Sequence, residues 1–299
     1  MQKGLKIRLY PNNNQINILN IIFGHTRFVY NYFLNYSKEN KDYKYNNWSK
    51  KLTELKNSEE TKFLKEADKF ALQNSLKNLK SAYDNFFSKR ADEPVFKKKH
   101  NLQSYRTNYT NNNIKLYDKG IKLPKLGIVK CKYNKDIKNN KIINVTIKYL
   151  KSGIYEASII YECEEQALLK TNKTVGIDLG VRKLITTSDN EKYISELDID
   201  RINNKIRKEQ RKLSRCKLHS SNWNKQRKKI AKIYQYKDNY MLDNIHKATK
   251  AIVSKYDVIY MEDLDIKDLL SKQKLKNHKR KMLTSSLGKI IRILEYKCE

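Results

Sequence analysis

The hydrophobic period changes along this chain in an order that restricts the fold to a mixture of strands and helices. Leu5, Ile7 and Leu9 alternate with polar residues, which predicts a strand. Between residues 14 and 90, apolar residues recur every three or four positions, which predicts a helical block. Residues 121–161 return to short strand-like runs separated by Asn and Gly turns. We therefore expect an α+β protein, with a β-barrel-like domain into which the helices are inserted.

The chain from Thr174 onward predicts a further region that mixes strands and helices, and 299 residues are enough for roughly two domains. The final expected helix reaches Glu299 without a cap, a glycine or a turn signal, so we expect a sequence that is truncated there. The expected elements are strands at 174–179, 183–187, 193–197 and 258–262, and helices at 199–217, at 222–254 and from Ser285.

The charge balance points to a polyanionic partner. The chain has 64 Lys and Arg against 32 Asp and Glu, a formal net charge of +32. Such an excess repels itself in a folded protein and favours nucleic acid, although a basic membrane-surface or ribosome-associated protein has the same balance. No run approaches the ~20 apolar residues of a membrane span, and the N-terminus lacks an apolar signal segment. We expect a soluble, cytoplasmic, nucleoid-associated protein with no membrane partner.

Three runs are dense in basic residues, at 97–99, 225–229 and 272–281. We consider them candidate contacts to phosphates, although most such runs in proteins are only solvated faces. The four cysteines are scattered, and the nearest two, Cys131 and Cys163, are 32 residues apart. No Cys-x-x-Cys pair exists, so no zinc site is expected in this chain.

Two carboxylates have the placement of metal ligands. Asp178 and Glu262 each end a predicted apolar strand. If these strands are neighbours in one sheet, both carboxylates lie at one sheet edge, where they can hold Mg²⁺. Two such ions ~3.5–4 Å apart can clamp the attacking and leaving oxygens of a phosphodiester. For either residue alone, a turn cap or a Lys partner explains the sequence equally well.

The carboxylates lie within two specific sequence motifs. Val-Gly-Ile-Asp-Leu-Gly-Val at 175–181 and Tyr-Asp-Val-Ile-Tyr-Met-Glu-Asp-Leu at 256–264 resemble the first two RuvC motifs of the TnpB (OrfB) family. These are transposon-encoded, RNA-guided nucleases related to the type V CRISPR effectors. The resemblance covers essentially the whole chain. Further matches, in the family's order, are Arg8–Pro11 with Gln15, Arg27–Asn31, Pro94–Lys99, Leu123–Gly127, His246–Lys247 and Leu294–Lys297.

The resemblance implies a domain order and a set of partners. It implies a WED-type β-barrel from residues 1–13 plus 91–170, a helical REC insertion at 14–90, and an RNase-H-like RuvC domain at 171–299. It also implies a guide RNA, a double-stranded DNA target, and Mg²⁺-dependent cleavage with Asp178 and Glu262 as catalytic and metal-binding residues. The candidate nucleic-acid contacts are Arg8, Tyr10, Arg27, Tyr30, Asn31, Lys97, Lys98, Lys99, Arg227, Lys228 and Lys229.

The chain departs from the family's pattern near residue 299. In the family a zinc ribbon and a third catalytic Asp follow there, and neither is present, so the RuvC domain is expected to be incomplete and cleavage impaired. Asp263 is expected on the opposite strand face from Glu262, because side chains alternate. Asp265 and Asp268, in the following loop or helix, are weak substitutes.

Other functions share parts of this pattern. The same fold could act as a nuclease-dead, RNA-guided transcriptional repressor, and a decaying or incompletely recorded transposon gene would give the same sequence. Actin-like and Hsp70-like ATPases also use Gly-Ile-Asp-Leu-Gly, but they need several later glycine-rich phosphate loops. This chain has eight glycines and no such loops.

Overall fold

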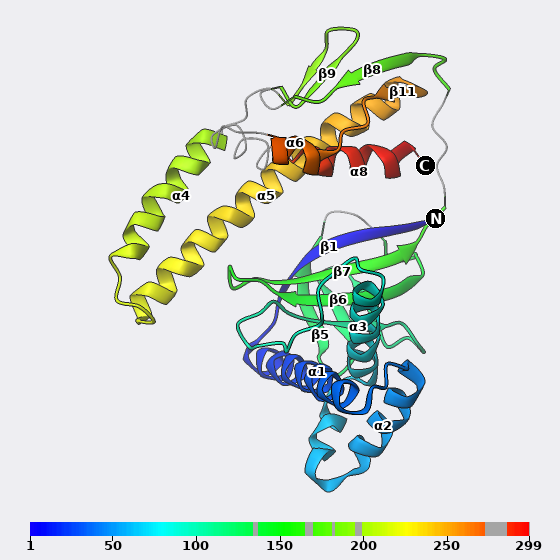
Figure 1. The fold of residues 1–299 in the computed structure, drawn as a ribbon, viewed down its shortest axis with the longest axis vertical. Helices are drawn as coiled ribbons and strands as arrows, with labels where there is room; N and C mark the ends of the chain where they lie inside the picture. The colour runs from blue at the N-terminus through cyan, green and yellow to red at the C-terminus, as the bar shows by residue number, and fades with distance from the viewer. Residues whose placement is uncertain (134–136, 165–169, 181–182, 195–198, 273–285, 299) are drawn as a thin grey trace. The chain divides into compact units, whose positions relative to one another are not determined.

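The fold is described from a computed structural model, which places residues 1–133, 137–164, 170–180, 183–194, 199–272 and 286–298 (Figure 1). The chain forms two compact units, Met1–Glu165 and Gln166–Glu299. The α+β class expected from the sequence is confirmed. No helix among the described residues has the length and apolar character needed to cross a membrane.

The first unit is built on a seven-stranded antiparallel sheet whose central strand is the N-terminal one. The sheet order is β2-β6-β7-β1-β5-β4-β3, and β1 pairs with both β7 and β5. Among the described residues no pairing joins the edge strands β2 and β3, so closure into a barrel stays a prediction. The strands are β1 (Gln2–Tyr10), β2 (Gln103–Asn108), β3 (Lys115–Tyr117), β4 (Gly120–Leu123), β5 (Gly127–Lys132), β6 (Ile142–Tyr149) and β7 (Tyr155–Glu162).

The predicted helical block is confirmed as helices that lie between β1 and β2 in the chain. The first of them begins at a capping box, in which Asn12 accepts from the Gln15 amide and Gln15 accepts from the Asn12 amide. The Gln15 side chain also donates to the Ile128 carbonyl at 2.9 Å, which ties the helix start to β5. The helices are α1 (Asn13–Asn40), α2 (Tyr45–Asn57), the 3-10 helix η1 (Glu59–Glu66) and α3 (Lys69–Phe87).

One core joins these helices to one face of the sheet. Ile7 and Leu9 of β1 are buried with Phe23 of α1 and Leu79 of α3 in a single apolar cluster. The alternate residues of β1 are exposed on the other face, as the period of two predicts. The sheet therefore has one face covered by helices and one face exposed.

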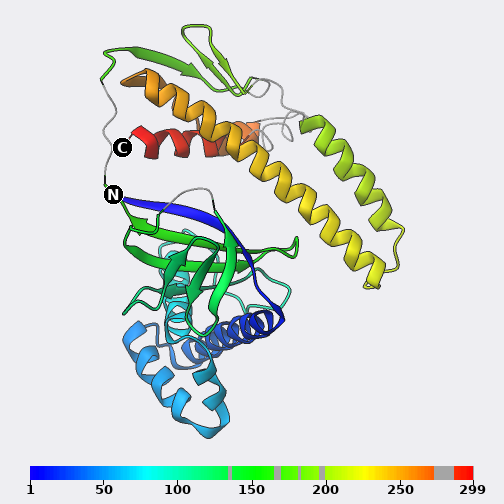
Figure 2. The same ribbon diagram turned by 180° about the vertical axis from the view of Figure 1, so that it is seen from behind.

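The second unit contains a four-stranded sheet in the order β10-β9-β8-β11. β8 and β11 are parallel, and the other pairs are antiparallel. Helices α5 and α8 lie on one side of the sheet (Figure 2). Ile245, Ile252 and Ile290 of these helices are buried in one apolar cluster with Val175 and Ile177 of β8. The elements are β8 (Thr174–Asp178), β9 (Ile185–Thr187), β10 (Lys192–Tyr193), α4 (Ile199–Ser214), α5 (Ser221–Lys255), β11 (Val258–Met261), α6 (Ile266–Lys272) and α8 (Leu287–Cys298).

Some expectations need correction. The strand before Asp178 looks buried in the sequence, but β8 has an exposed face. In β11, which is apolar in sequence, the Tyr260 side chain is 65% exposed. β2 and β3 were missed. The expected strand at 193–197 is described only as far as Tyr193 in β10, and residues 195–198 lie outside the described residues. In the basic run 272–281, only Lys272 is described.

Candidate functional site

The parallel pair β8 and β11 brings the two predicted carboxylates to one sheet edge. The register pairs Ile177 with Met261, so the next residues are Asp178, which ends β8, and Glu262, which directly follows β11. Val175 and Ile177 face the core, and strand alternation therefore turns Asp178 outward. Both carboxylates line one open hollow of about 500 Å³. Its other lining residues are Gly176, Ile177, Thr186, Thr187, Ser188, Tyr260 and Met261.

The two carboxylates are exposed and available to a ligand. Among the described residues, neither the Asp178 nor the Glu262 side chain has a hydrogen-bond or ion-pair partner. Two adjacent carboxylates without a cation partner are unexpected in a chain of net charge +32. A hard divalent cation that prefers oxygen ligands fits this donor set.

Three further acids, Asp263, Asp265 and Asp268, follow Glu262 in the chain. β11 ends at Met261, so Asp263 lies beyond the strand, and the expectation about the face on which it lies stays a prediction. Asp265 accepts a hydrogen bond from the Asp268 amide at 3.1 Å and so caps α6. Asp268 forms an ion pair with Lys272. None of the three lines the hollow.

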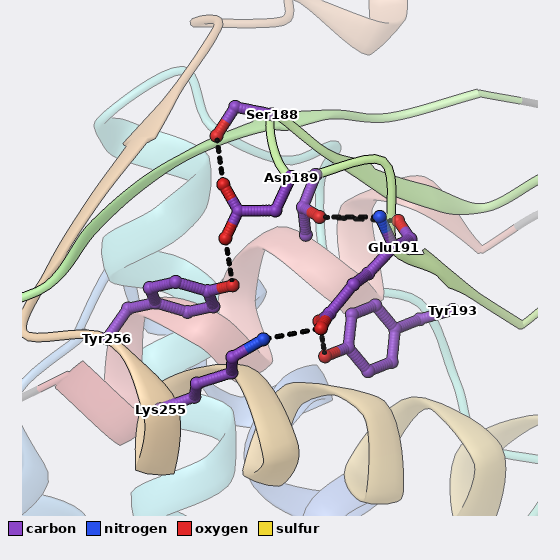
Figure 3. A network of polar contacts seen from close by, with 7 residues as sticks. Ser188, Asp189, Glu191, Tyr193, Lys255 and Tyr256 are labelled. Atoms are coloured by element: carbon purple, nitrogen blue, oxygen red, sulfur yellow. Dashed lines mark hydrogen bonds and ion pairs between the residues drawn. The ribbon is translucent and has the colours of Figure 1, made fainter.

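A polar network beside the hollow was not predicted from the sequence (Figure 3). Asp189 accepts a hydrogen bond from the Tyr256 hydroxyl at 2.6 Å, and Glu191 accepts one from the Tyr193 hydroxyl at 2.6 Å. Lys255 forms an ion pair with Glu191. The contacts with Lys255 and Tyr193 lower the pKa of the Glu191 carboxyl. Burial and the Glu191 contact raise the pKa of Tyr193 to about 12.

This network has two consequences for the site. The Asp189 and Glu191 carboxylates already have partners within the protein, namely Tyr256 for Asp189 and Tyr193 and Lys255 for Glu191. Among the described residues, no three or more His, Cys, Asp or Glu are arranged to hold a metal. The network also fixes the turn that carries Ser188. The Ser188 amide donates to the Gly176 carbonyl at 2.8 Å, and the Gly176 amide donates to the Ser188 hydroxyl at 3.2 Å. The turn thereby holds β8 two residues before Asp178.

A glycine is required two residues after Asp178 for a steric reason. A Cβ atom on Gly180 would lie 2.7 Å from the Lys183 carbonyl oxygen, which is closer than side chains tolerate. Gly176 of the same motif has more room, because a Cβ there would meet the Ser188 Cβ at 3.7 Å. The tight approach at Gly180 holds its backbone against that of Lys183, between β8 and β9.

The exposed face of the first sheet carries many cations. Arg8 and Tyr10 lie on this face of β1, and the Arg8 guanidinium is 4.9 Å from the centre of the Tyr10 ring. In register, Arg8 is flanked by Lys132 on one side and Glu156 on the other. Exposed basic residues on the same face, placed there by strand alternation and register, are Lys6, Arg106, Lys115, Lys122, Lys130 and Lys132.

A second group of predicted contacts converges where the 97–99 segment meets α1. Asn31 and the Lys97 backbone exchange two hydrogen bonds, of 3.0 and 2.8 Å. The Lys97 ammonium lies 3.7 Å from the centre of the Tyr30 ring, and this partial burial lowers the pKa of Lys97. Tyr30 itself is only 5% exposed, so its ring is not available to a base, and we correct the expectation of a direct contact for it.

A small basic hollow of about 50 Å³ adjoins this group. Arg27, Lys97, Lys98 and Arg106 contribute to its lining, and Arg27 donates to the Gln103 side chain at 2.8 Å. Lys99 is exposed on the same segment, next to this hollow in the sequence. Apart from Tyr30, the predicted contacts of the first unit therefore lie on accessible basic surfaces.

The predicted contacts of the second unit lie on α5, close to its start. Arg227 and Lys228 are exposed there, and the Arg227 guanidinium lies 4.9 Å from the centre of the Trp223 ring. Lys229 is exposed as well but forms an ion pair with Glu209 at 3.0 Å.

The sheets and helices together define an α+β protein whose fold is similar to that of a Cas12f chain. The chain matches a chain in the cryo-EM structure of the Cas12f1-sgRNA-target DNA complex with a TM-score of 0.57 and 10% identity. The match covers 100% of this chain and 87% of that one.

Family comparisons identify the group within this class. Residues 158–273 match the OrfB family of IS605 elements, described as a probable transposase, and residues 1–44 match its helix-turn-helix domain. In the structure, residues 1–44 form β1 and the single continuous helix α1. The chain belongs to the TnpB (OrfB) family.

Two relatives are similar along most of the chain. One, from Escherichia coli (strain K12), is named "Putative RNA-guided DNA endonuclease InsQ". It is 32% identical over 282 residues, which are 89% of this chain and 67% of that protein. The other, from Streptomyces pristinaespiralis, is named "Putative RNA-guided DNA endonuclease". It is 28% identical over 305 residues, covering 100% of this chain and 75% of that protein.

Proposed function

We propose that this chain binds a guide RNA and a complementary DNA target, and that Asp178 and Glu262 hold Mg²⁺ for cleavage of the DNA backbone. The observation that carries the proposal is the parallel register of β8 and β11, which places two unpartnered carboxylates on one hollow. Membership of a family with relatives named as RNA-guided DNA endonucleases supports it. We assign β1–β7 to a WED domain, α1–α3 to a REC domain and the second unit to a RuvC domain.

Each group of residues has a separate task in this proposal. The cations on the exposed face of the first sheet and around the 97–99 segment attract phosphates without reading sequence, because they contact only the backbone charge. Sequence choice then comes from base pairing between guide and target. The Ser188–Gly176 contacts hold β8 so that Asp178 stays beside Glu262.

The carboxylate pair determines how fast we expect DNA cleavage to be. Mg²⁺ bound there would polarise the phosphodiester and favour a metal-bound water as the nucleophile. Asp178 and Glu262 would bind it through carboxylate oxygens. Because the described residues offer this pair and no third carboxylate in metal-binding geometry, we expect one loosely held ion and slow cleavage.

The test uses the full chain co-expressed with the DNA that surrounds its gene, so that its RNA is supplied. A plasmid that carries the matching target is incubated with the complex and Mg²⁺ or EDTA. We expect target binding in a gel-shift assay, slow Mg²⁺-dependent nicking, and loss of nicking in Asp178→Ala and Glu262→Ala with binding retained. Asp263→Ala is the matched control and should nick like the unchanged chain.

The possible outcomes separate the two parts of the proposal. Nicking that persists in both carboxylate variants would show that cleavage occurs elsewhere or comes from a contaminant. Target binding with no nicking by the unchanged chain would instead favour RNA-guided repression. Absence of target binding with any co-expressed RNA would refute the proposal as a whole.

A further inference from the structure

Helices α4 and α5 form a hairpin. A buried polar contact between Glu209 of α4 and Gln226 of α5, the Glu209 seam, helps to join the two helices. Ile202 and Ile206 of α4 are buried, as is Ile230 of α5, and the two helices run side by side in both views (Figures 1 and 2). Glu209 continues the buried α4 stripe at the next helical step and accepts a 2.7 Å hydrogen bond from the Gln226 side chain. Gln226 also donates to the Glu209 carbonyl at 2.9 Å, so a carboxylate occupies a position that an apolar residue would normally take.

Glu209 is the single acidic residue between positions 201 and 232, and it is hidden from solvent. Its residue surface is 5% exposed, and Lys229 and Lys212 approach its two carboxylate oxygens at 3.0 and 3.5 Å. The Gln226 and Lys229 hydrogen bonds lower the pKa of Glu209 to about 2, so it stays ionised at neutral pH. The charge of this acid therefore stabilises the hairpin from inside and contributes little negative potential at its surface.

Between residues 201 and 232 every charged side chain on the surface of the hairpin is therefore cationic, and the nearest exposed acids of the two helices are Asp200 and Asp238. Every Lys and Arg in this stretch is exposed, and among the described residues only Lys212 and Lys229 have a carboxylate partner. Such a concentration of one sign costs stability through self-repulsion, which a bound polyanion removes. The exposed cations are Arg201, Lys205, Arg207, Lys208, Arg211, Lys212, Arg215, Lys217, Lys225, Arg227, Lys228, Lys229 and Lys232.

An aromatic group lies at the tip of the hairpin. Trp223, in the first turn of α5, is half-buried, with the His219 ring 5.3 Å away edge-on and the Arg227 guanidinium 4.9 Å from its ring centre. His219 has a φ of +63°, so the turn holds it in the left-handed region. Aromatic rings and guanidinium planes are the groups on which proteins stack unpaired bases.

We propose that the α4–α5 hairpin is an RNA-binding arm, with its cations on the backbone and a base stacked at Trp223 and Arg227. Unpaired bases that can stack on a ring are exposed in RNA loops and single strands, whereas duplex DNA keeps its bases stacked inside. The inference rests on the proposed function for an RNA partner but involves neither Asp178 nor Glu262.

The first experiment measures how RNA affinity depends on salt. A triple variant, Lys225→Gln, Lys228→Gln and Lys232→Gln, removes three exposed cations without touching the Glu209 seam. If each contacts a phosphate of single-stranded RNA, the slope of log K against log salt should become shallower by about 2, from about 0.7 per phosphate. The matched control, Lys44→Gln, Lys50→Gln and Lys65→Gln, removes the same charge from exposed positions of the first unit and should keep the slope.

The second experiment uses the tryptophans. The chain has two, and Trp48 is fully buried in the first unit, so quenching of tryptophan fluorescence by a single-stranded RNA oligonucleotide reports on Trp223. We expect quenching by RNA that exceeds quenching by a DNA duplex of equal length. Trp223→Ala should weaken RNA binding by about tenfold, within the range for loss of one stacked base. Trp223→Phe should retain most of the affinity.

Three results would overturn the inference. They are equal slopes for the two triple variants, no quenching of Trp223 by RNA, and stronger quenching by duplex DNA. If the unchanged chain binds RNA and the hairpin variants bind it equally well, the arm is refuted and the proposed function stands. If the unchanged chain binds no RNA, both fail.

Discussion

Gly180 offers a stringent test of how the fold positions Asp178. A methyl group at this position would lie 2.7 Å from the Lys183 carbonyl oxygen, well inside the ~3.5 Å of an ordinary carbon contact. The clash is with a backbone atom, so it is relieved only if the Gly180 and Lys183 backbones move apart. We expect Gly180→Ala to destabilise the β8–β9 pairing by about 1–3 kcal/mol, the range for overpacking.

Gly176→Ala is the matched control in the same motif. Its added methyl group would lie 3.7 Å from the Ser188 side chain, an ordinary contact, so we expect a change within about 0.5 kcal/mol. Hydrogen exchange of the β8 and β9 amides, resolved by peptide, measures the free energy of local opening in each variant. Equal effects of the two substitutions, or no effect of Gly180→Ala, would refute the steric argument.

Two further predictions concern charged groups. Asp178→Asn and Glu262→Gln should each weaken Mg²⁺ binding by about tenfold or more, because a carboxylate ligand is lost. Calorimetry on the full chain measures this binding. Asp263→Asn should change it little, and equal losses of Mg²⁺ affinity in all three variants would contradict the site. The pKa of Glu209 is lowered from its ordinary 4.5 to about 2 in the folded chain, so its stabilising effect is present above about pH 4.5 and is lost as the pH falls towards 2. Hydrogen exchange of α4 and α5 should show this loss, and Glu209→Gln should remove the part of the acid sensitivity that this residue causes; an unchanged acid profile in the variant would contradict the assignment.

The periodic elements were predictable because each buries one face. Leu5, Ile7 and Leu9 alternate along β1, and Ile7 and Leu9 are indeed buried. β2 escaped prediction because in Gln-Ser-Tyr-Arg-Thr-Asn only Tyr105 and Thr107 are buried, and a Tyr and a Thr give no apolar alternation. This strand forms because β6 supplies its hydrogen-bond partners, which a local pattern does not reveal.

The two carboxylates of the candidate site could be singled out from the sequence, whereas their surroundings could not. Asp178 and Glu262 could be singled out because each follows an apolar run, but the parallel register that joins them is a tertiary fact. The Asp189–Tyr256 hydrogen bond spans 67 residues and has no sequence signal. The inference about Asp263 relied on strand alternation, whereas β11 ends two residues before it.

The central claim, that RNA directs this protein, is tested most directly by sequencing the RNA that remains bound after purification from cells carrying the gene and its flanking DNA. After a high-salt wash that removes backbone-only contacts, the account predicts one discrete RNA species, strongly enriched over cellular RNA. A random mixture of RNA fragments in proportion to their cellular abundance would contradict it.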